Sequence, residues 1–173
     1  MKFESPLKVF GGSDASAFSI VAGFDRSQKS LRLFWEIQGP LEELILAPQV
    51  ENPEYKEGLW EKTCFEFFCG KAASPHYDEW NFSTSTDWAH FSFESPRQRQ
   101  VPQRTKRPLT VDFHLESTML ARMSVELEKI DFDVFNLSCV LEHSTRVKTY
   151  WALDHRRSQP DFHDRISWSP INL

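Results

Sequence analysis

The sequence predicts an all-β protein, a single-domain antiparallel β-sandwich of jelly-roll type that spans residues 1–173. Three observations predict it. Short segments in which apolar and polar side chains alternate recur at intervals of roughly ten residues, separated by turn residues. Aromatic residues make up 14% of the chain, with fifteen phenylalanines and six tryptophans, and flat rings fill the space between packed sheets well. A length of 173 residues is enough for one domain with a sizeable core.

The first predicted strands lie near the N-terminus. Residues 18–24 (FSIVAGF) are an apolar run that ends at a polar turn. Residues 31–37 (LRLFWEI) alternate so that one face of the strand is fully apolar, and Trp35 on that face is expected in the core. The short apolar segment 41–46 fits either a helical turn or a strand. The acidic, proline-containing segment 48–57 is expected to be a loop.

The central stretch is the most aromatic part of the chain. Residues 64–69 (CFEFFC) predict a strand that is apolar except at Glu66. Successive side chains of a strand point to opposite faces, so Glu66 shares its face with Cys64 and Phe68. Two further strands, joined by a turn-rich connection, are predicted at 80–83 and 88–93.

The C-terminal half continues the pattern. Residues 109–115 and 135–141 alternate and predict strands. Segment 115–129 is ambiguous, because its apolar residues fit both a helical spacing of four and an alternation of two. Three elements complete the expected order: a short strand at 150–153, a charged loop at 154–165 and a terminal strand at 166–173.

Composition excludes several classes of function. The net charge of −5 argues against nucleic-acid binding, which needs a positive field. No apolar run has the length of a membrane span, and the N-terminus has no signal-peptide core, so we expect a cytoplasmic protein. Three cysteines are an odd number and do not suggest a disulfide framework. Cys64, in an apolar setting beside an acid, is expected to be a buried thiol rather than a nucleophile.

The tryptophans suggest a sugar-binding face. The C–H groups of a sugar ring pack on an aromatic plane, while its hydroxyls need polar partners at the ring edge. Trp60, Trp80 and Trp151 have acids, amides or bases close by in the sequence, as Trp88 does. The alternative is that most of these rings pack in the core or at its rim, and sequence alone leaves both interpretations open.

Two charged groups extend the candidate site. Glu66 lies between two phenylalanines, and a buried acid is costly unless it has a partner. It could accept a hydrogen bond from a ligand or form an ion pair with Arg97 or Arg165. The segment 97–107 is basic and contains no acid, so it is either a solvated loop or an anion contact.

The charged loop contains residue types that bind divalent metals. His155, Asp161 and His163 could hold such an ion, but their spacing is a weak signal for one. The other interpretation is a rigid loop whose side chains bind backbone groups or a ligand, since neutral histidine both donates and accepts hydrogen bonds. We therefore expect no cofactor.

Three stretches of the sequence resemble a known family. GLWEKTCFEFF followed by YDEWNFSTSTDWAHFSF, and later YWALDHRRSQPDFHDRISW, are similar to the motifs of DOMON-like domains, relatives of the type 9 carbohydrate-binding modules. The similarity is to a bacterial subgroup that is sometimes fused to UDP-N-acetylenolpyruvoylglucosamine reductase. It implies a β-sandwich that binds sugars or haem, and it favours a strand at 121–127. Haem is not expected, because no histidine pairs with Met119 or Met123, the two methionines expected on a core strand.

The function predicted from sequence is non-catalytic binding of a small polar ligand, a carbohydrate or sugar-derived metabolite, on an aromatic-lined face. The expected cytoplasmic location favours a soluble or nucleotide-linked sugar over a polysaccharide. Stacking is assigned to Trp60, Trp80 and Trp151. Hydrogen bonds are assigned to Glu66, Asn81, His155, His163 and Arg165, with Asp161 and Arg97 added, the latter for an anionic ligand. One alternative is a hydrolase or isomerase that uses Glu66 or Asp161 with His155 or His163. Another is a protein-interaction domain, which would present a flat apolar patch.

Overall fold

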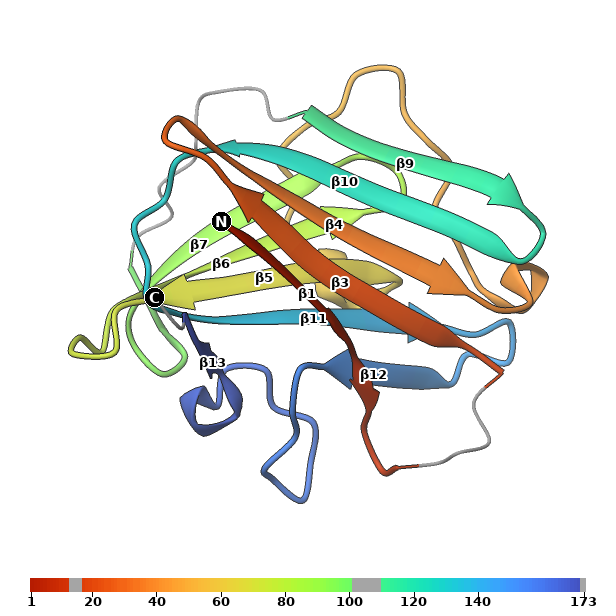
Figure 1. The fold of residues 1–173 in the computed structure, drawn as a ribbon. Coiled ribbons are helices and arrows are strands. Elements are labelled where there is room, and N and C mark those ends of the chain that lie inside the picture. Colours follow the sequence, from red (N-terminus) through yellow and green to blue (C-terminus); the bar gives the residue numbers. More distant parts are fainter. Residues whose placement is uncertain (13–16, 101–109, 172–173) are drawn as a thin grey trace.

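The computed structural model describes residues 1–12, 17–100 and 110–171. Two antiparallel sheets pack face to face, as Figure 1 shows, and the regular elements besides strands are short 3-10 helices. The predicted all-β antiparallel sandwich is confirmed. Within the described residues, no helix is long and apolar enough to cross a membrane.

One sheet has five strands in the order β1-β3-β4-β10-β9. Their bounds are Lys2–Pro6 for β1, Ser19–Arg26 for β3, Ser30–Gln38 for β4, Leu120–Glu128 for β10 and Thr110–Ser117 for β9. The ambiguous segment 115–129 is therefore a hairpin of two strands. Its strand β10 pairs with β4 along its whole length, which a helix could not do.

The other sheet carries the candidate site and has the order β2-β12-β11-β5-β6-β7-β8. Its strands are β2 (Lys8–Val9), β12 (Lys148–Ala152), β11 (Val134–Glu142), β5 (Cys64–Gly70), β6 (Tyr77–Ser83), β7 (Trp88–Ser95) and β8 (Gln98–Arg99). An additional strand, β13 (Ser169–Pro170), pairs with β11. Three 3-10 helices lie between strands: η1 (Leu41–Glu43), η2 (Leu59–Glu61) and η3 (Arg165–Ser167).

The main core lies between the sheets and follows from the alternation in the sequence. On β4, every second residue from Leu31 to Ile37 is buried, including Trp35. Phe65 and Phe67 of β5 enter the same core, and the Trp35 and Phe65 rings are 5.7 Å apart. Glu66 lies between Phe65 and Phe67 in the sequence and therefore points to the opposite face of its sheet. The described cysteines are free and buried, as expected.

Several local predictions need correction. The strand predicted at 166–173 is limited to β13, because η3 occupies 165–167, and residues 172–173 lie outside the described residues. Met119 is exposed in a turn rather than on a core strand. Strands β1 and β2 were not predicted, since the half-exposed segment KFESP shows no apolar alternation. The segment 41–46 begins as a 3-10 helix and then forms one bridge to His143, just after β11.

Candidate functional site

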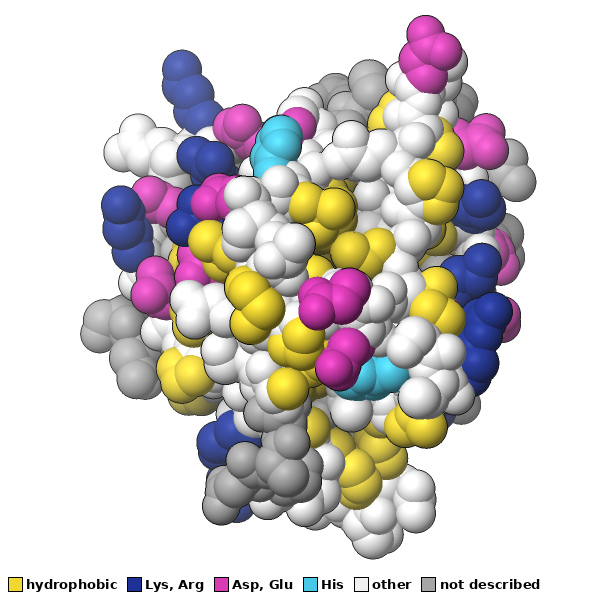
Figure 2. Space-filling model, turned by 90° about the vertical axis from the view of Figure 1, so that its right-hand side faces the viewer, with side chains coloured by type: hydrophobic (Ala, Val, Ile, Leu, Met, Phe, Trp, Pro, Cys, Tyr) yellow, Lys and Arg dark blue, Asp and Glu magenta, His cyan; other side chains and the backbone are white. Residues whose placement is uncertain are grey.

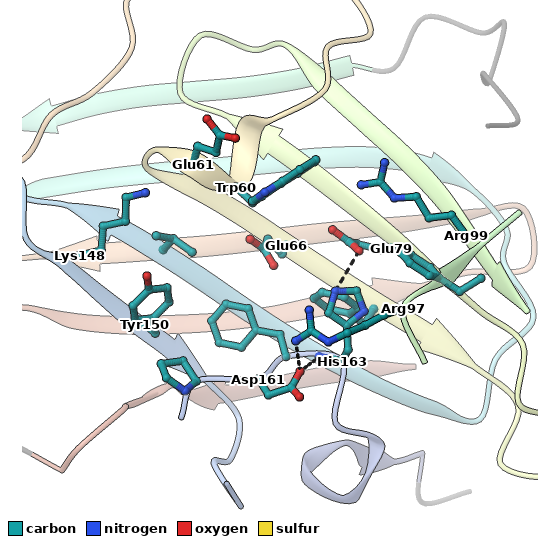
Figure 3. Close-up of a pocket in the computed structure, with 15 residues that line it drawn as sticks. Trp60, Glu61, Glu66, Glu79, Arg97, Arg99, Lys148, Tyr150, Asp161 and His163 are labelled. Carbon is teal, nitrogen blue, oxygen red and sulfur yellow. Dashed lines mark hydrogen bonds and ion pairs between the residues drawn. The ribbon is translucent and has the colours of Figure 1, made fainter. Parts of the chain in front are cut away.

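A hollow of about 490 Å³ opens on the outer face of the larger sheet (Figure 3). Strand register explains its floor. Glu66 of β5 is paired with Asn81 of β6, and two residues further along, Phe68 is paired with Glu79. All four side chains point to the outer face of the sheet. Both acids therefore lie on the same face of adjacent strands. The lining residues are Trp60, Glu61, Glu66, Phe68, Glu79, Phe93, Arg97, Arg99, Val140, Lys148, Tyr150, Pro160, Asp161, Phe162 and His163.

Trp60 is held at the rim of the hollow by the short helix η2. The turn before η2 needs Gly58, whose φ of 80° disfavours other residues. The indole packs edge-on against Phe91, with ring centroids 5.7 Å apart. The Arg99 guanidinium lies over both rings, 3.7 Å from the Phe91 centroid and 5.2 Å from that of Trp60. These contacts fix the half-buried Trp60 indole in the same hollow as the carboxyl groups of Glu66 and Glu79.

A loop after β12 forms the wall of the hollow that Figure 3 shows across from Trp60. Asp161 accepts hydrogen bonds from the Arg97 guanidinium at 2.9 Å and from the backbone N–H of His163 at 3.1 Å. Arg97 in turn belongs to the turn between β7 and β8, so the ion pair ties two distant segments together. The loop therefore has a defined position over the sheet.

Two buried carboxyl groups form the polar floor. Glu66 is 3% exposed, and burial together with the nearby Glu79 charge raises its pKa well above the usual range. Glu66 has no hydrogen bond or ion pair with any residue that the structure describes. Glu79 accepts a hydrogen bond from Asn81 at 2.7 Å, and burial raises its pKa as well. Burial thus favours the protonated form of both acids.

His163 contributes a neutral ring next to this floor. The Tyr77 hydroxyl accepts a hydrogen bond from the Arg97 backbone N–H at 3.1 Å, so its own proton is free for Nδ1 of His163 at 2.8 Å. The imidazole then carries its proton on Nε2, which is 3.6 Å from Oε2 of Glu79. Burial, with the charges of Arg97 and Arg99, lowers the pKa of His163 to about 4.

The low pKa of His163 predicts a pH-dependent stability. Between the unfolded value of 6.5 and about 4, the unfolded chain binds more protons than the folded one, so stability falls as the pH falls through this window. The loss corresponds to roughly 3 kcal/mol of unfolding free energy. We expect urea titrations of wild type and His163→Gln to converge or cross between pH 7 and pH 4. A constant difference across that range would contradict the prediction.

The structure brings part of the predicted site together. Trp60, Glu66, Arg97, Asp161 and His163 all line the hollow. Asn81 is fully buried, and its amide holds Glu79. Of the two partners considered for Glu66, neither forms an ion pair with it, since Arg97 binds Asp161.

Two predicted stacking residues lie in the core between the sheets instead. Trp80 is 6% exposed and stacks on His90, with centroids 3.9 Å apart. Trp151 is also buried, and its Nε1 donates to the Thr149 hydroxyl at 3.0 Å. A sugar could reach either ring only if the core opened, so neither is retained as a stacking residue.

His155 and Arg165 are placed outside the hollow. His155 donates from Nε2 to the Lys8 carbonyl at 2.9 Å and lines a different depression, although its ring contacts Phe162 with centroids 6.3 Å apart. Arg165 donates to the Lys71 carbonyl at 2.6 Å and also to the Ser74 carbonyl. In the described part of the chain, no three potential metal ligands gather. The three-residue metal set considered from sequence is not assembled.

Several lining residues were not singled out from sequence. Lys148 and Tyr150 alternate with buried Trp151 on β12, so the strand period could have assigned them to the outer face. Phe162 lies in the loop wall, where no periodic signal exists. Of the basic segment, Arg97 and Arg99 belong to the site, whereas Arg104, Lys106 and Arg107 lie outside the described residues.

Comparison with solved structures defines the fold class. A protein of Bacteroides uniformis with a provisional carbohydrate-binding assignment matches 96% of this chain and 84% of its own, with a TM-score of 0.67 and 11% identity. A family 9 carbohydrate-binding module of Caldicellulosiruptor kristjanssonii, solved with glucose and with cellotriose, matches 82% of this chain with a TM-score of 0.52 and 10% identity. It is covered over 70% and 69% of its length in the two structures.

These similarities show a common fold, the β-sandwich of carbohydrate-binding modules. No protein-family model matches the sequence, and no curated protein matches significantly. The ligand of this chain must therefore be argued from the chemistry of its hollow.

Proposed function

We propose that this protein binds a carbohydrate or a sugar-derived small molecule, without catalysis, in the hollow on the larger sheet. One observation supports this most directly: an accessible indole, Trp60, lies beside two buried carboxyl groups, Glu66 and Glu79, in one concavity. Its volume of about 490 Å³ falls within the range of small-molecule sites.

The lining matches the two kinds of surface on a sugar. Trp60, with Tyr150 across the hollow in Figure 3, offers aromatic surface to C–H groups. Glu66, Glu79 and His163 offer acceptors and donors to hydroxyl groups. A protonated carboxyl does both, which suits a hydroxyl that itself donates and accepts.

The comparisons support this proposal at the level of fold. The Caldicellulosiruptor module was solved with glucose and cellotriose, and a sugar ligand is consistent with the sandwich that this chain shares with it. We also propose that the chain belongs with the DOMON-like relatives of such modules. Nucleotide-linked sugars belong among the candidate ligands, because Arg97, Arg99 and Lys148 line the same hollow and could meet phosphates.

An enzyme acting on a sugar is the second candidate. The observation in its favour is that two acids with raised pKa values share a hollow with a histidine. A protein-interaction domain is less favoured, since the hollow has converging polar groups. On the face that Figure 2 shows, exposed hydrophobic side chains are divided by charged and polar ones.

Ligand-induced stabilisation tests the proposed function. A ligand at one hundred times its Kd stabilises the folded state by about 2.7 kcal/mol, which raises the Tm of a domain of this size by about 5–10 °C. We expect such a rise for at least one member of a panel of mono-, di- and nucleotide sugars at millimolar concentration. Sorbitol at equal concentration controls for solvent effects. No rise beyond sorbitol would contradict binding, and product released in the same samples would favour the enzyme.

A further inference from the structure

We infer that the hollow prefers a sugar that bears a protonated amine, with the ammonium group held by the carboxyl groups of Glu66 and Glu79. This inference rests on the proposed function and specifies the ligand class. It comes from a buried acid for which the protein supplies no partner among the described residues.

Glu66 is the first observation. It is 3% exposed, lines the hollow, and forms no hydrogen bond or ion pair with a described residue. Its carboxyl group faces the hollow, so solvent or a ligand has to supply its hydrogen-bond partner. Its neighbours across the strands do not satisfy it: Asn81 gives its amide hydrogen to Glu79, and the Ser138 hydroxyl is buried without a partner. A group supplied by a ligand would satisfy Glu66.

The charges of Arg99 and Arg97 act on Glu79, but none of the described cations near the hollow forms an ion pair with Glu66. Arg97 is paired with Asp161 at 2.9 Å, and Arg99 lies over Phe91 and pairs with Glu57 at 3.7 Å. Lys148 belongs to β12, separated from Glu66 by strand β11. His163 approaches Glu79 to 3.6 Å but stays uncharged near neutral pH, because its pKa is about 4. No described cation is paired with Glu66, so a cationic partner for this carboxyl group would have to come from a ligand.

An ammonium group has the matching chemistry. It offers three N–H donors from one centre and can reach both carboxyl groups, which lie on adjacent strands in diagonal positions. Hydrogen bonds between ions of opposite charge are roughly twice as strong as neutral ones. In the complex Glu66 is a carboxylate, so any proton that it carries beforehand passes to the buffer, and the ligand amine keeps its own proton.

Isothermal titration calorimetry tests this with glucosamine, glucose and N-acetylglucosamine at pH 6.5. We expect glucosamine to bind at least about tenfold more tightly than glucose. N-acetylglucosamine, which has lost the charge, should bind no better than glucose. Repeating the glucosamine titration in buffers of different ionisation enthalpy should show release of up to one proton. Equal affinity for glucosamine and glucose would overturn the inference.

Matched substitutions locate the effect. Glu66→Gln keeps the side-chain shape and removes the charge, so the ratio of glucosamine affinity to glucose affinity should fall to within about twofold of unity, whatever the affinity for glucose itself. Glu79→Gln should lower the preference too. The control Glu126→Gln, exposed on β10 of the other sheet, should keep it. If Glu66→Gln and Glu79→Gln both kept the wild-type preference for glucosamine over glucose, the inference would be overturned. Absence of binding to every sugar would overturn the proposed function as well.

Discussion

Trp60→Ala is expected to weaken sugar binding by about thirtyfold or more, equivalent to about 2 kcal/mol. The reason is geometric: Trp60 is the tryptophan that lines the hollow, and it is held against Phe91 next to the buried acids. Removing the indole removes the stacking plane and admits water to the rim. Calorimetry with whichever sugar gives the largest thermal shift measures the change.

Two comparisons make the result specific to the ring. Trp60 is only half-buried, so Trp60→Ala should lower the unfolding free energy by no more than about 1–2 kcal/mol and leave a folded protein. Trp60→Phe keeps an aromatic plane and should retain most of the affinity. It should also abolish any ligand-induced change in tryptophan fluorescence. Wild-type affinity in folded Trp60→Ala would rule out stacking on this residue.

Trp80→Ala is expected to do the opposite, losing stability rather than affinity. Trp80 is 6% exposed in the core between the sheets, and large-to-small substitutions there cost about 3–5 kcal/mol. The Tm should fall by about 6–20 °C, measured by calorimetry or circular dichroism. Since domains of this kind are stable by only about 5–15 kcal/mol, a large share of the stability is lost.

Trp80→Phe is the matched control for the core position. The indole Nε1 of Trp80 is buried without a hydrogen-bond partner, so phenylalanine removes an unsatisfied donor while keeping most of the ring. Its cost should be smaller than that of Trp80→Ala, because less side-chain volume is removed from the core. Sugar affinity of folded Trp80→Phe should equal that of wild type. A folded variant that had lost binding would return Trp80 to the site.

The contrast between Trp60 and Trp80 shows that polar neighbours in the sequence do not by themselves identify a stacking tryptophan. Both have polar neighbours, Glu61 for one, Glu79 and Asn81 for the other. On a strand, however, a neighbour one residue away points to the opposite face. Glu79 and Asn81 therefore belong to the outer face of β6 because Trp80 belongs to the inner one. The strand period, applied strictly to residues 77–83, is enough to separate the indole from these two polar side chains.

Other parts of the site had no such local signal. Trp60 lies in a 3-10 helix after a loop, where no period applies, and Arg97 lies in a turn. Asp161 and His163 lie in a loop distant in sequence from the strands they cover. The contact of Asp161 with Arg97 and that of His163 with Tyr77 join residues 64 and 86 positions apart. Short-range patterns carry no information about such pairs.

The sequence alone determined the central strands that alternate clearly, such as β4 and β11, and the sandwich that their apolar faces require, because alternation with a period of two is a local property and burial follows from it. It also placed Glu66 on one face of its strand with Cys64 and Phe68, opposite Phe65 and Phe67. Only the tertiary structure decided which aromatic ring meets that acid. Strand order, register and the position of the loop over β5 and β6 depend on contacts between distant segments. Those contacts bring polar residues that are far apart in the sequence together around one hollow.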